Sequence, residues 1–258
     1  MLSGNPLFNL LKIDKNLRGK LGGIYAVGVG PGSPKYVTET VREIIQNCDV
    51  VIGYKYTLET IQDLLVGKEI HEVTMGSQEE SYQKILPALG KRNLVIPFTG
   101  DVNFSESEVV DRLIEIFGDV EIIPGISSIQ VAASKAQVPL DKSKVITMHV
   151  TTSIEEKKLE LQKALIDGFS VILVPRPWPK QPDKHFMPSE IAVYLREHNF
   201  DTSKMKVHVF EAITTENETS FEGTVKELEG KEFSDLSVMV FNQTSLDSYM
   251  NYKWQWED

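Results

Sequence analysis

The stretch YAVGVGPGSPKYVT, residues 25–38, places Gly28, Gly30 and Gly32 around Pro31, between an apolar run and the start of a helical pattern. Glycine-rich turns between a strand and a helix often bind phosphate through backbone N–H groups. Proline has no backbone N–H, so Pro31 removes a donor where a phosphate would need one. The segment is therefore either a tight turn without a ligand or a loop that binds another kind of group.

The glycine spacing does not fit the common nucleotide-binding loops. A dinucleotide loop has glycine at its first, third and sixth positions and an acidic residue at the end of the next strand. Here the third glycine comes at the fifth position, and the next apolar run ends in Gly53 and Tyr54. No Gly-Lys-Ser/Thr follows, as a P-loop requires. Val27 stands where common methyltransferase loops carry an acid before the first glycine. On this loop alone, both interpretations stay open.

Two further segments carry glycine with small hydroxyl or carboxylate residues after an apolar run. They are PFTGDVNF, residues 97–104, and IPGISSIQVAAS, residues 123–134. Each is compatible with an ordinary turn. Ligands of open α/β sheets bind at the carboxyl ends of the strands, so three such loops together predict a crevice there. Backbone amides and carbonyls would line it, which suits a polar, zwitterionic ligand.

Apolar, β-branched runs alternate with amphipathic stretches along the chain, which predicts an α/β protein with a largely parallel sheet. Thr38 or Ser33 is suited to cap the first helix, and Gly118 and Gly168 are suited to end two later ones. The expected helices are 37–48, 106–117, 153–167 and 187–200, and the expected strands are 23–29, 49–54, 93–98, 119–124, 144–150, 170–175, 205–213 and 236–241.

The pattern divides the chain into an N-terminal arm, residues 1–22, an α/β domain, 23–140, and a second α/β domain with a mixed sheet, 141–258. No apolar stretch approaches the ~20 residues that span a membrane, and the arm is too interrupted for a signal sequence. Cys48 is the only cysteine, so no internal disulfide can form. These features predict a cytoplasmic protein without membrane contact.

The charge pattern argues against nucleic acid and metal as ligands. The formal net charge is −10, whereas a nucleic-acid binder would show a basic face. The histidines are isolated from one another in the sequence, without the spacing of a metal site. They stand at positions 71, 149, 185, 198 and 208.

In order and spacing, VGVGPGS, TGD, PGISSIQVAAS and VFEAIT resemble the tetrapyrrole methylase family, over residues 23–241. The resemblance implies two α/β domains with S-adenosylmethionine in the cleft between them and no metal cofactor. Within the family, the chain looks most like the C5-methyltransferases that act on cobalt-precorrin-7 in cobalamin biosynthesis. By position, the resemblance places these residues against the methyl donor: Pro31, Thr99, Gly100, Asp101, Phe104, Ser127, Ser128, Val174, Ala212 and Ile213.

Asp101 and His149 are the best titratable candidates for proton transfer in such a site. Asp101 is also suited to cap a helix, and His149 to be a strand histidine with a structural role. The sequence departs from the family pattern at Val102, where proline is usual. It also has TMHVTT in place of a Ser-Leu-His-Gly run. These departures put the acceptor, more than the donor, in question.

The segment VPRPWPKQPDKHFMP, residues 174–188, combines five prolines with several basic side chains. Cobalt-precorrins carry several carboxylates, which Arg and Lys bind through charge-assisted hydrogen bonds. Arg176 and Lys180 are therefore candidates for binding the acceptor, and Tyr54 and Lys55 are weaker ones. The alternative is a stiff surface loop without a ligand.

The sequence thus predicts methylation of a cobalt-precorrin, at C5 of cobalt-precorrin-7. The alternatives are a methylase of another tetrapyrrole or ring position, and a non-catalytic binder of a tetrapyrrole or an adenosyl metabolite. The resemblance also implies a homodimer, and a separate protein for any C15 methylation and decarboxylation.

Overall fold

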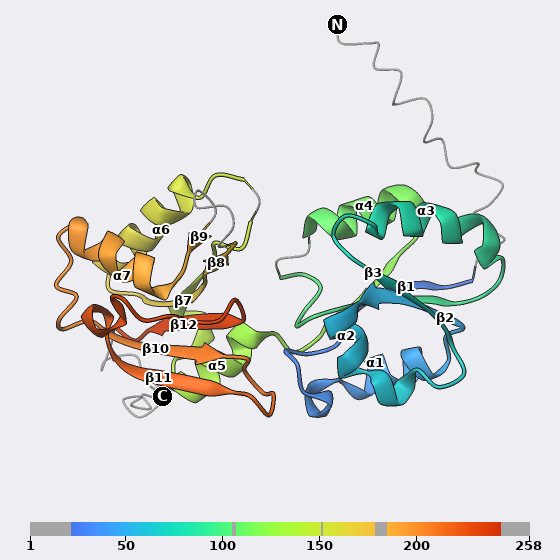
Figure 1. The fold of residues 1–258 in the computed structure, drawn as a ribbon, viewed down its shortest axis with the longest axis horizontal. Coiled ribbons are helices and arrows are strands. Elements are labelled where there is room, and N and C mark those ends of the chain that lie inside the picture. The colour runs from blue at the N-terminus through green and yellow to red at the C-terminus, as the bar shows by residue number, and fades with distance from the viewer. Residues whose placement is uncertain (1–21, 105–106, 151, 179–184, 244–258) are drawn as a thin grey trace, which may run out of the picture. The chain divides into compact units, whose positions relative to one another are not determined.

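The computed structural model describes residues 22–104, 107–150, 152–178 and 185–243 of the 258-residue chain (Figure 1). The chain divides into two compact units, the first ending at Ser127 and the second beginning at Ser128. Each unit has its own five-stranded sheet. Lys180 and most of the predicted N-terminal arm lie outside the described residues.

The sheet of the first unit is parallel throughout, with strand order β3-β2-β4-β1-β5. Four of these strands are among those that the sequence predicts. Within the unit, their buried positions alternate between the two faces of the sheet: Ala26 packs in one core and Val27 in the other. The strands are β1 (Ile24–Gly28), β2 (Val50–Tyr54), β3 (Glu69–Val73), β4 (Leu94–Phe98) and β5 (Glu121–Ile123).

Helices cover both faces of this sheet (Figure 1). The core that contains Val27 includes residues of α1 and α2, and the core that contains Ala26 includes residues of α3 and α4. The predicted cap of the first helix is confirmed, because the Thr38 hydroxyl accepts a hydrogen bond from Val41 N at 3.4 Å. The helices are α1 (Glu39–Gln46), α2 (Lys55–Thr60), α3 (Gln78–Leu89) and α4 (Ser107–Phe117), with the short 3-10 turns η2 (Pro34–Tyr36) and η3 (Gln62–Leu64).

The second sheet is mixed, as the sequence predicts, with strand order β11-β10-β12-β7-β6. Strands β6 and β7 are parallel, and β12 runs antiparallel to both β7 and β10, so β6, β7 and β10 point in the same direction. The strands are β6 (Ser143–Thr147), β7 (Ser170–Val174), β10 (Lys206–Glu211), β11 (Thr219–Thr224) and β12 (Ser237–Phe241), with a separate antiparallel pair β8 (Arg176–Pro177) and β9 (His185–Phe186).

One face of the second sheet packs against α6, α7 and the turn η6, and α5 lies against β7 and β12 on the other (Figure 1). Because α5 joins this sheet, the division between the units comes earlier than the boundary after residue 140 that the sequence predicts. The elements are α5 (Ser128–Ala136), η4 (Leu140–Lys142), α6 (Glu155–Ile166), α7 (Pro188–Glu197) and η6 (Val225–Leu228).

The sequence does not predict two of the strands, because they lie at sheet edges and have few buried side chains. Strands β3 and β11 read EIHEV and TSFEGT, with mostly exposed or half-buried residues. Their backbone pairs with β2 and β10, respectively. An edge strand can be polar because one neighbour and solvent satisfy its backbone groups. Hydrophobic periodicity alone therefore could not find them.

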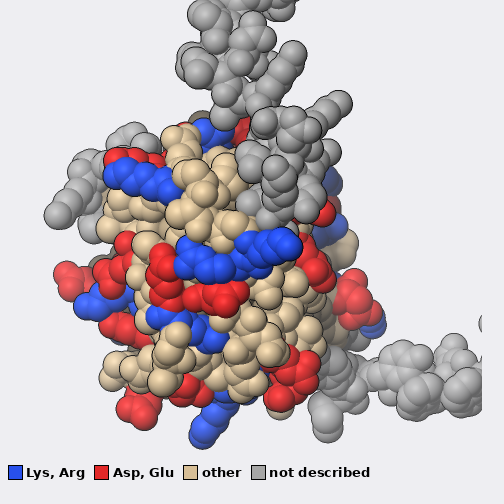
Figure 2. Space-filling view, turned by 90° about the vertical axis from the view of Figure 1, so that its right-hand side faces the viewer, with Lys and Arg blue, Asp and Glu red and all other residues tan. Residues whose placement is uncertain are grey.

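Positive and negative side chains are intermixed on the face of the molecule in Figure 2. On the face that Figure 2 shows, Lys and Arg side chains alternate with Asp and Glu, without a large area of one sign. The net charge of −10 is therefore not gathered into one patch on this face. No helix among the described residues is long and apolar enough to cross a bilayer.

Candidate functional site

The three predicted loops of the first unit meet at one edge of its sheet. They follow β1, β4 and β5, which are adjacent and parallel, so their carboxyl ends lie together. The chain leaves β1 toward α1 on one face and leaves β4 toward α4 on the other (Figure 1). Such a point, where neighbouring strands send the chain to opposite faces, is where open α/β sheets form a ligand crevice.

The loops after β1 and β4 are joined by an isolated antiparallel bridge between Gly30 and Gly100. Gly100 N donates to Gly30 O at 2.8 Å, and Gly30 N donates to Gly100 O at 3.3 Å. Both residues have positive φ, +82° and +73°. Glycine adopts this conformation without the steric cost that other residues carry, which explains why these two positions are glycine.

The third loop packs against the same point. A Cβ on Gly28 would lie 2.5 Å from Gly100 O and 2.7 Å from Gly125 N. A Cβ on Gly125 would lie 2.5 Å from Gly28 O. The backbones of the three loops therefore touch, and they leave no room for a side chain between them.

Asp101 ties two of these loops together. Its Oδ2 accepts a hydrogen bond from Gly125 N at 2.8 Å, and its Oδ1 accepts one from Asn103 N at 2.8 Å. Helix α4 begins only at Ser107, so Asp101 does not cap it. Both carboxylate oxygens are engaged with backbone amides, which gives Asp101 a role in holding the loops.

The other predicted donor-binding residues of this unit differ in exposure. Pro31 and Ser127 are buried and Phe104 is half-buried, whereas Thr99 is exposed; Ser128, the first residue of the second unit, is half-buried. All of them belong to the loops at the carboxyl edge or to the first residue of α5. The first unit thus brings its share of the predicted residues to one place.

Tyr54 and Lys55, predicted to bind the acceptor, stand at the end of β2 and the start of α2, also at this edge. Tyr54 donates its hydroxyl proton to Gln78 Oε1 at 2.7 Å. Lys55 is exposed, with Glu59 Oε1 3.8 Å from its ammonium group. Of the two residues, Lys55 is the charged one, and its ammonium group is exposed where a carboxylate of a dissolved ligand can reach it.

The predicted residues of the second unit also share one edge. His149 follows β6, Val174 ends β7, and Ala212 and Ile213 follow β10. These strands point the same way, so the four residues lie at or just beyond the carboxyl ends of the three strands. Ala212 has a φ of +44° although it is not glycine, and Ile213 is buried.

His149 packs its imidazole edge-on against Trp178, with the ring centres 4.9 Å apart. The residue as a whole stays exposed, but the protein around the ring partly removes it from water. This desolvation lowers the pKa of His149, and the charge of Asp235 opposes the shift in part. The imidazole is thereby kept neutral over a wider pH range, as a proton acceptor requires.

Arg176 occupies an unexpected position. The sequence predicts an exposed basic loop, but this residue is only 3% exposed. Its Nη2 donates to Thr152 O at 2.8 Å, and its guanidinium lies 5.7 Å from the ring centre of Trp178. In the structure, Arg176 supports the β8–β9 region from within, and its binding of an acceptor stays a prediction.

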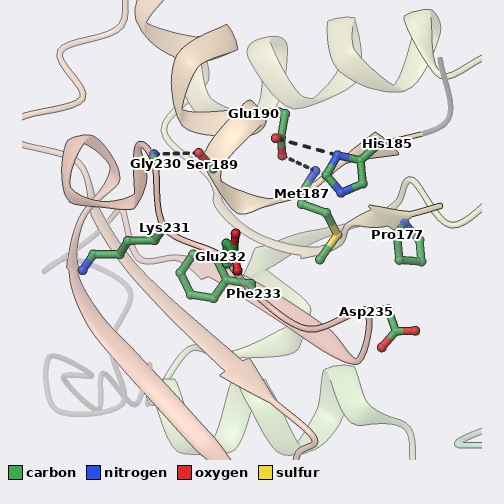
Figure 3. A pocket seen from close by; sticks show the side chains of 10 residues that line it. All are labelled: Pro177, His185, Met187, Ser189, Glu190, Gly230, Lys231, Glu232, Phe233 and Asp235. Atoms are coloured by element: carbon green, nitrogen blue, oxygen red, sulfur yellow. Dashed lines mark hydrogen bonds and ion pairs between the residues drawn. The ribbon is translucent and has the colours of Figure 1, made fainter. Parts of the chain in front are cut away.

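A cavity of about 560 Å³ lies in the second unit, between the β8–β9 pair, the start of α7 and residues 230–235 (Figure 3). Figure 3 shows His185 beside Glu190, whose Oε2 also accepts a bond from Met187 N at 3.1 Å. Acidic and basic side chains both line it, including Lys231 and Asp235. The sequence did not single out this cavity, because part of its wall, residues 230–235, lies far along the chain from the rest.

Among the described residues, no three His, Cys, Asp or Glu side chains come together as a metal-binding set.

The comparison with protein families matches residues 23–229 to the model of the Tetrapyrrole (Corrin/Porphyrin) Methylases. The chain belongs to the tetrapyrrole methylase family. Members of this family use S-adenosylmethionine as methyl donor, so the protein is a methyltransferase of tetrapyrroles. The family and fold that the sequence resemblance implied are confirmed.

Two relatives illustrate the range of this tetrapyrrole methylase's similarities. A probable cobalt-precorrin-7 C(5)-methyltransferase from Methanocaldococcus jannaschii is 31% identical over 231 residues, which cover 84% of this chain and 97% of that protein. A cobalt-factor III methyltransferase from Priestia megaterium is 31% identical over 130 residues, 46% of this chain and 24% of that protein.

Solved structures of the family share the fold. The methyltransferase CobJ has a TM-score of 0.70 with 18% identity, covering 87% of this chain and 95% of its own. The precorrin-6Y methylase cbiE from Archaeoglobus fulgidus has a TM-score of 0.60 with 22% identity, covering 85% and 97%.

Proposed function

We propose that this tetrapyrrole methylase transfers a methyl group from S-adenosylmethionine to C5 of cobalt-precorrin-7 in cobalamin biosynthesis. The observation that carries the proposal is the similarity to the probable C(5)-methyltransferase, which covers 84% of this chain and 97% of that protein. The other relative matches a shorter segment and acts on a different tetrapyrrole by its name. Length of match therefore favours the C5 reaction over the alternatives.

The residues at the carboxyl edge of the first sheet fit a methyl donor. In the proposal, Pro31, Thr99, Gly100, Phe104 and Ser127 border the donor. Their loops offer backbone amides and carbonyls, and the contact of Gly28, Gly100 and Gly125 holds these groups in fixed directions. A preorganised polar surface binds a zwitterion without having to reorder its own groups.

In the second unit, we assign Val174, Ala212, Ile213 and the neighbouring Ser128 to the same ligand. Val174 and Ile213 are apolar, and such walls exclude water from a reacting centre. The donor supplies an electrophilic methyl on a sulfonium, and the acceptor supplies the electron-rich ring carbon. The chain's main task is then to align the two and keep them dry.

We assign proton removal from the acceptor to His149. Its lowered pKa keeps an imidazole nitrogen free to accept a proton near neutral pH. We assign Asp101 a positioning role, because both of its oxygens already accept backbone N–H bonds. Each oxygen keeps a second lone pair, so proton transfer by Asp101 stays the alternative.

Binding of the acceptor's carboxylates calls for positively charged side chains of the protein. Lys55 is exposed at the edge of the first sheet and is our first candidate, with Tyr54 beside it. Arg176 and Lys180 stay candidates from the sequence. Arg176 is buried, so its guanidinium would have to become exposed to reach an acceptor.

The test supplies cobalt-precorrin-7 and a donor with a carbon-13 methyl group, and locates the label by NMR. Label at C5 supports the proposal, and label at another ring carbon replaces C5 by that position. Titration calorimetry with S-adenosylhomocysteine, without added metal, tests donor binding separately. Tight donor binding without transfer to any tetrapyrrole would favour a non-catalytic binder.

We also propose a cytoplasmic homodimer that works beside a separate C15-methylating, decarboxylating protein. Family resemblance is the support for the dimer. Sedimentation at micromolar concentration tests it, and a stable monomer would contradict it.

A further inference from the structure

The segment that follows β10 holds two residues in an unfavourable backbone conformation. Ala212 has a φ of +44° and Thr214 a φ of +72°. Neither is glycine, and left-handed conformations cost energy for other residues, most of all for a β-branched one such as threonine. They persist where the surroundings hold them, and they cluster at sites that bind ligands.

Glu218 is the side chain that holds this segment. Its Oε2 accepts a hydrogen bond from Thr214 N at 2.6 Å, directly at the second left-handed residue. Its Oε1 accepts a bond from Lys135 Nζ at 2.6 Å. The side chain of Glu218 is only 23% exposed. A simple surface ion pair would not use its second oxygen on a strained backbone amide.

Lys135 connects the segment to another predicted donor contact. It lies in the last turn of α5, the helix that begins with Ser128. The contacts therefore link the last turn of α5, through Lys135 and Glu218, to the backbone of Thr214. A second bond, from Thr215 Oγ1 to Ala212 O at 2.7 Å, closes the turn from the other side.

We propose that Glu218, fixed by Lys135, is a positioning residue for the methyl donor. It holds the backbone of residues 212–214 in the shape that the donor binds. This inference rests on the proposed function, since that function places Ala212 and Ile213 against the donor. Glu218 itself touches neither reactant in this account.

Calorimetry with S-adenosylhomocysteine tests the role without the acceptor. Replacing Glu218 by Ala removes a charge-assisted contact, and we expect the Kd to rise about tenfold or more. Glu218→Gln keeps an acceptor for Thr214 N, so its Kd should rise less. Glu229→Ala is the matched control. It removes another ion pair of the same unit, with Arg196 Nε at 2.9 Å, and should leave the Kd unchanged.

A rescue separates positioning from general stability. Glycine adopts positive φ without strain. Adding Thr214→Gly to Glu218→Ala should therefore restore a large part of the affinity. In steady-state assays, Glu218→Ala should raise the KM for the donor more than it lowers kcat, and leave the KM for the acceptor unchanged.

Three results would overturn the inference: an unchanged Kd in Glu218→Ala, an equal change in Glu229→Ala, or no recovery with Thr214→Gly. If the unaltered protein itself fails to bind S-adenosylhomocysteine, the proposed function falls, and the inference with it. The wild-type titration thus distinguishes the two failures.

Discussion

A methyl group added at Gly125 would test whether contact between three backbones shapes the donor site. The Cβ of alanine would lie 2.5 Å from Gly28 O and also against Gly100 O. Carbon and oxygen normally stay about 3.3 Å or more apart, so the loops would have to separate by at least about 0.8 Å. Both obstacles are backbone atoms and cannot turn aside as a side chain could. The loop that carries Ser127 would be displaced.

Overpacking of this kind costs about 1–3 kcal/mol. For a chain of this size, each kcal/mol lowers the Tm by about 2–4 °C, so we expect a fall of about 2–12 °C. The free energy of donor binding should fall by more than the free energy of unfolding, because the proposed donor contacts depend on the spacing of all three loops. A misplacement of about 1 Å can also cost about a hundredfold in rate, so kcat/KM should fall as well.

The assay combines thermal unfolding with calorimetry of S-adenosylhomocysteine binding. Gly76→Ala is the matched control in the same unit, since a Cβ there meets nothing within 4 Å. It should change neither the Tm nor the Kd. If Gly125→Ala binds the ligand as the unaltered protein does, the contact of the three loops does not shape the site, and the reasoning is refuted.

Three further predictions concern single side chains. Asp101→Asn keeps one acceptor oxygen but turns an amide N–H toward a backbone N–H. We expect the free energy of unfolding, measured with denaturant, to fall by about 1.5–3 kcal/mol. An unchanged free energy of unfolding would contradict the role of Asp101 in holding Gly125. Arg176→Met keeps much of the buried volume but removes the hydrogen bond to Thr152 O. The free energy of unfolding should therefore fall by about 1–3 kcal/mol. Unchanged stability with weakened acceptor binding would instead support the carboxylate-binding role that the sequence predicts. For His149, desolvation lowers the folded pKa below its ordinary 6.5, so the stability that it contributes is present above about pH 6.5 and is lost as the pH falls through the folded pKa. The acid limb of kcat/KM should also lie below about pH 6.5 and disappear in His149→Asn, and a limb that persists in this variant would exclude His149 as the base.

The amino-acid sequence was sufficient to predict the buried strands and the loops that follow them. Strands such as β1 and β4 are continuous apolar runs because parallel strands are covered on both faces. The glycines at their ends mark backbones that approach closely. Edge strands β3 and β11 lack this signal, since neighbouring strands and water satisfy them.

Side-chain directions were harder to predict than elements. The basic residues of 174–188 suggested a charged surface, but the side chain of Arg176 turns inward onto a backbone carbonyl. The bond from Gly125 N to Asp101 spans residues from two different loops, and that from Lys135 to Glu218 spans an even longer interval. Local patterns do not contain such pairings, because they exist only once the sheet has brought the segments together.

The two sheets solve one physical problem in the same way. In each, a tight turn follows the carboxyl end of a strand, β4 in the first sheet and β10 in the second, and one carboxylate accepts a hydrogen bond from a backbone amide of the loops at that edge. Asp101 does so with Gly125 N, and Glu218 with Thr214 N. A carboxylate that accepts a hydrogen bond from a backbone amide fixes the direction of the neighbouring peptide groups. If the proposed donor site is right, the rigid placement of these peptide groups determines its preference for a zwitterionic ligand.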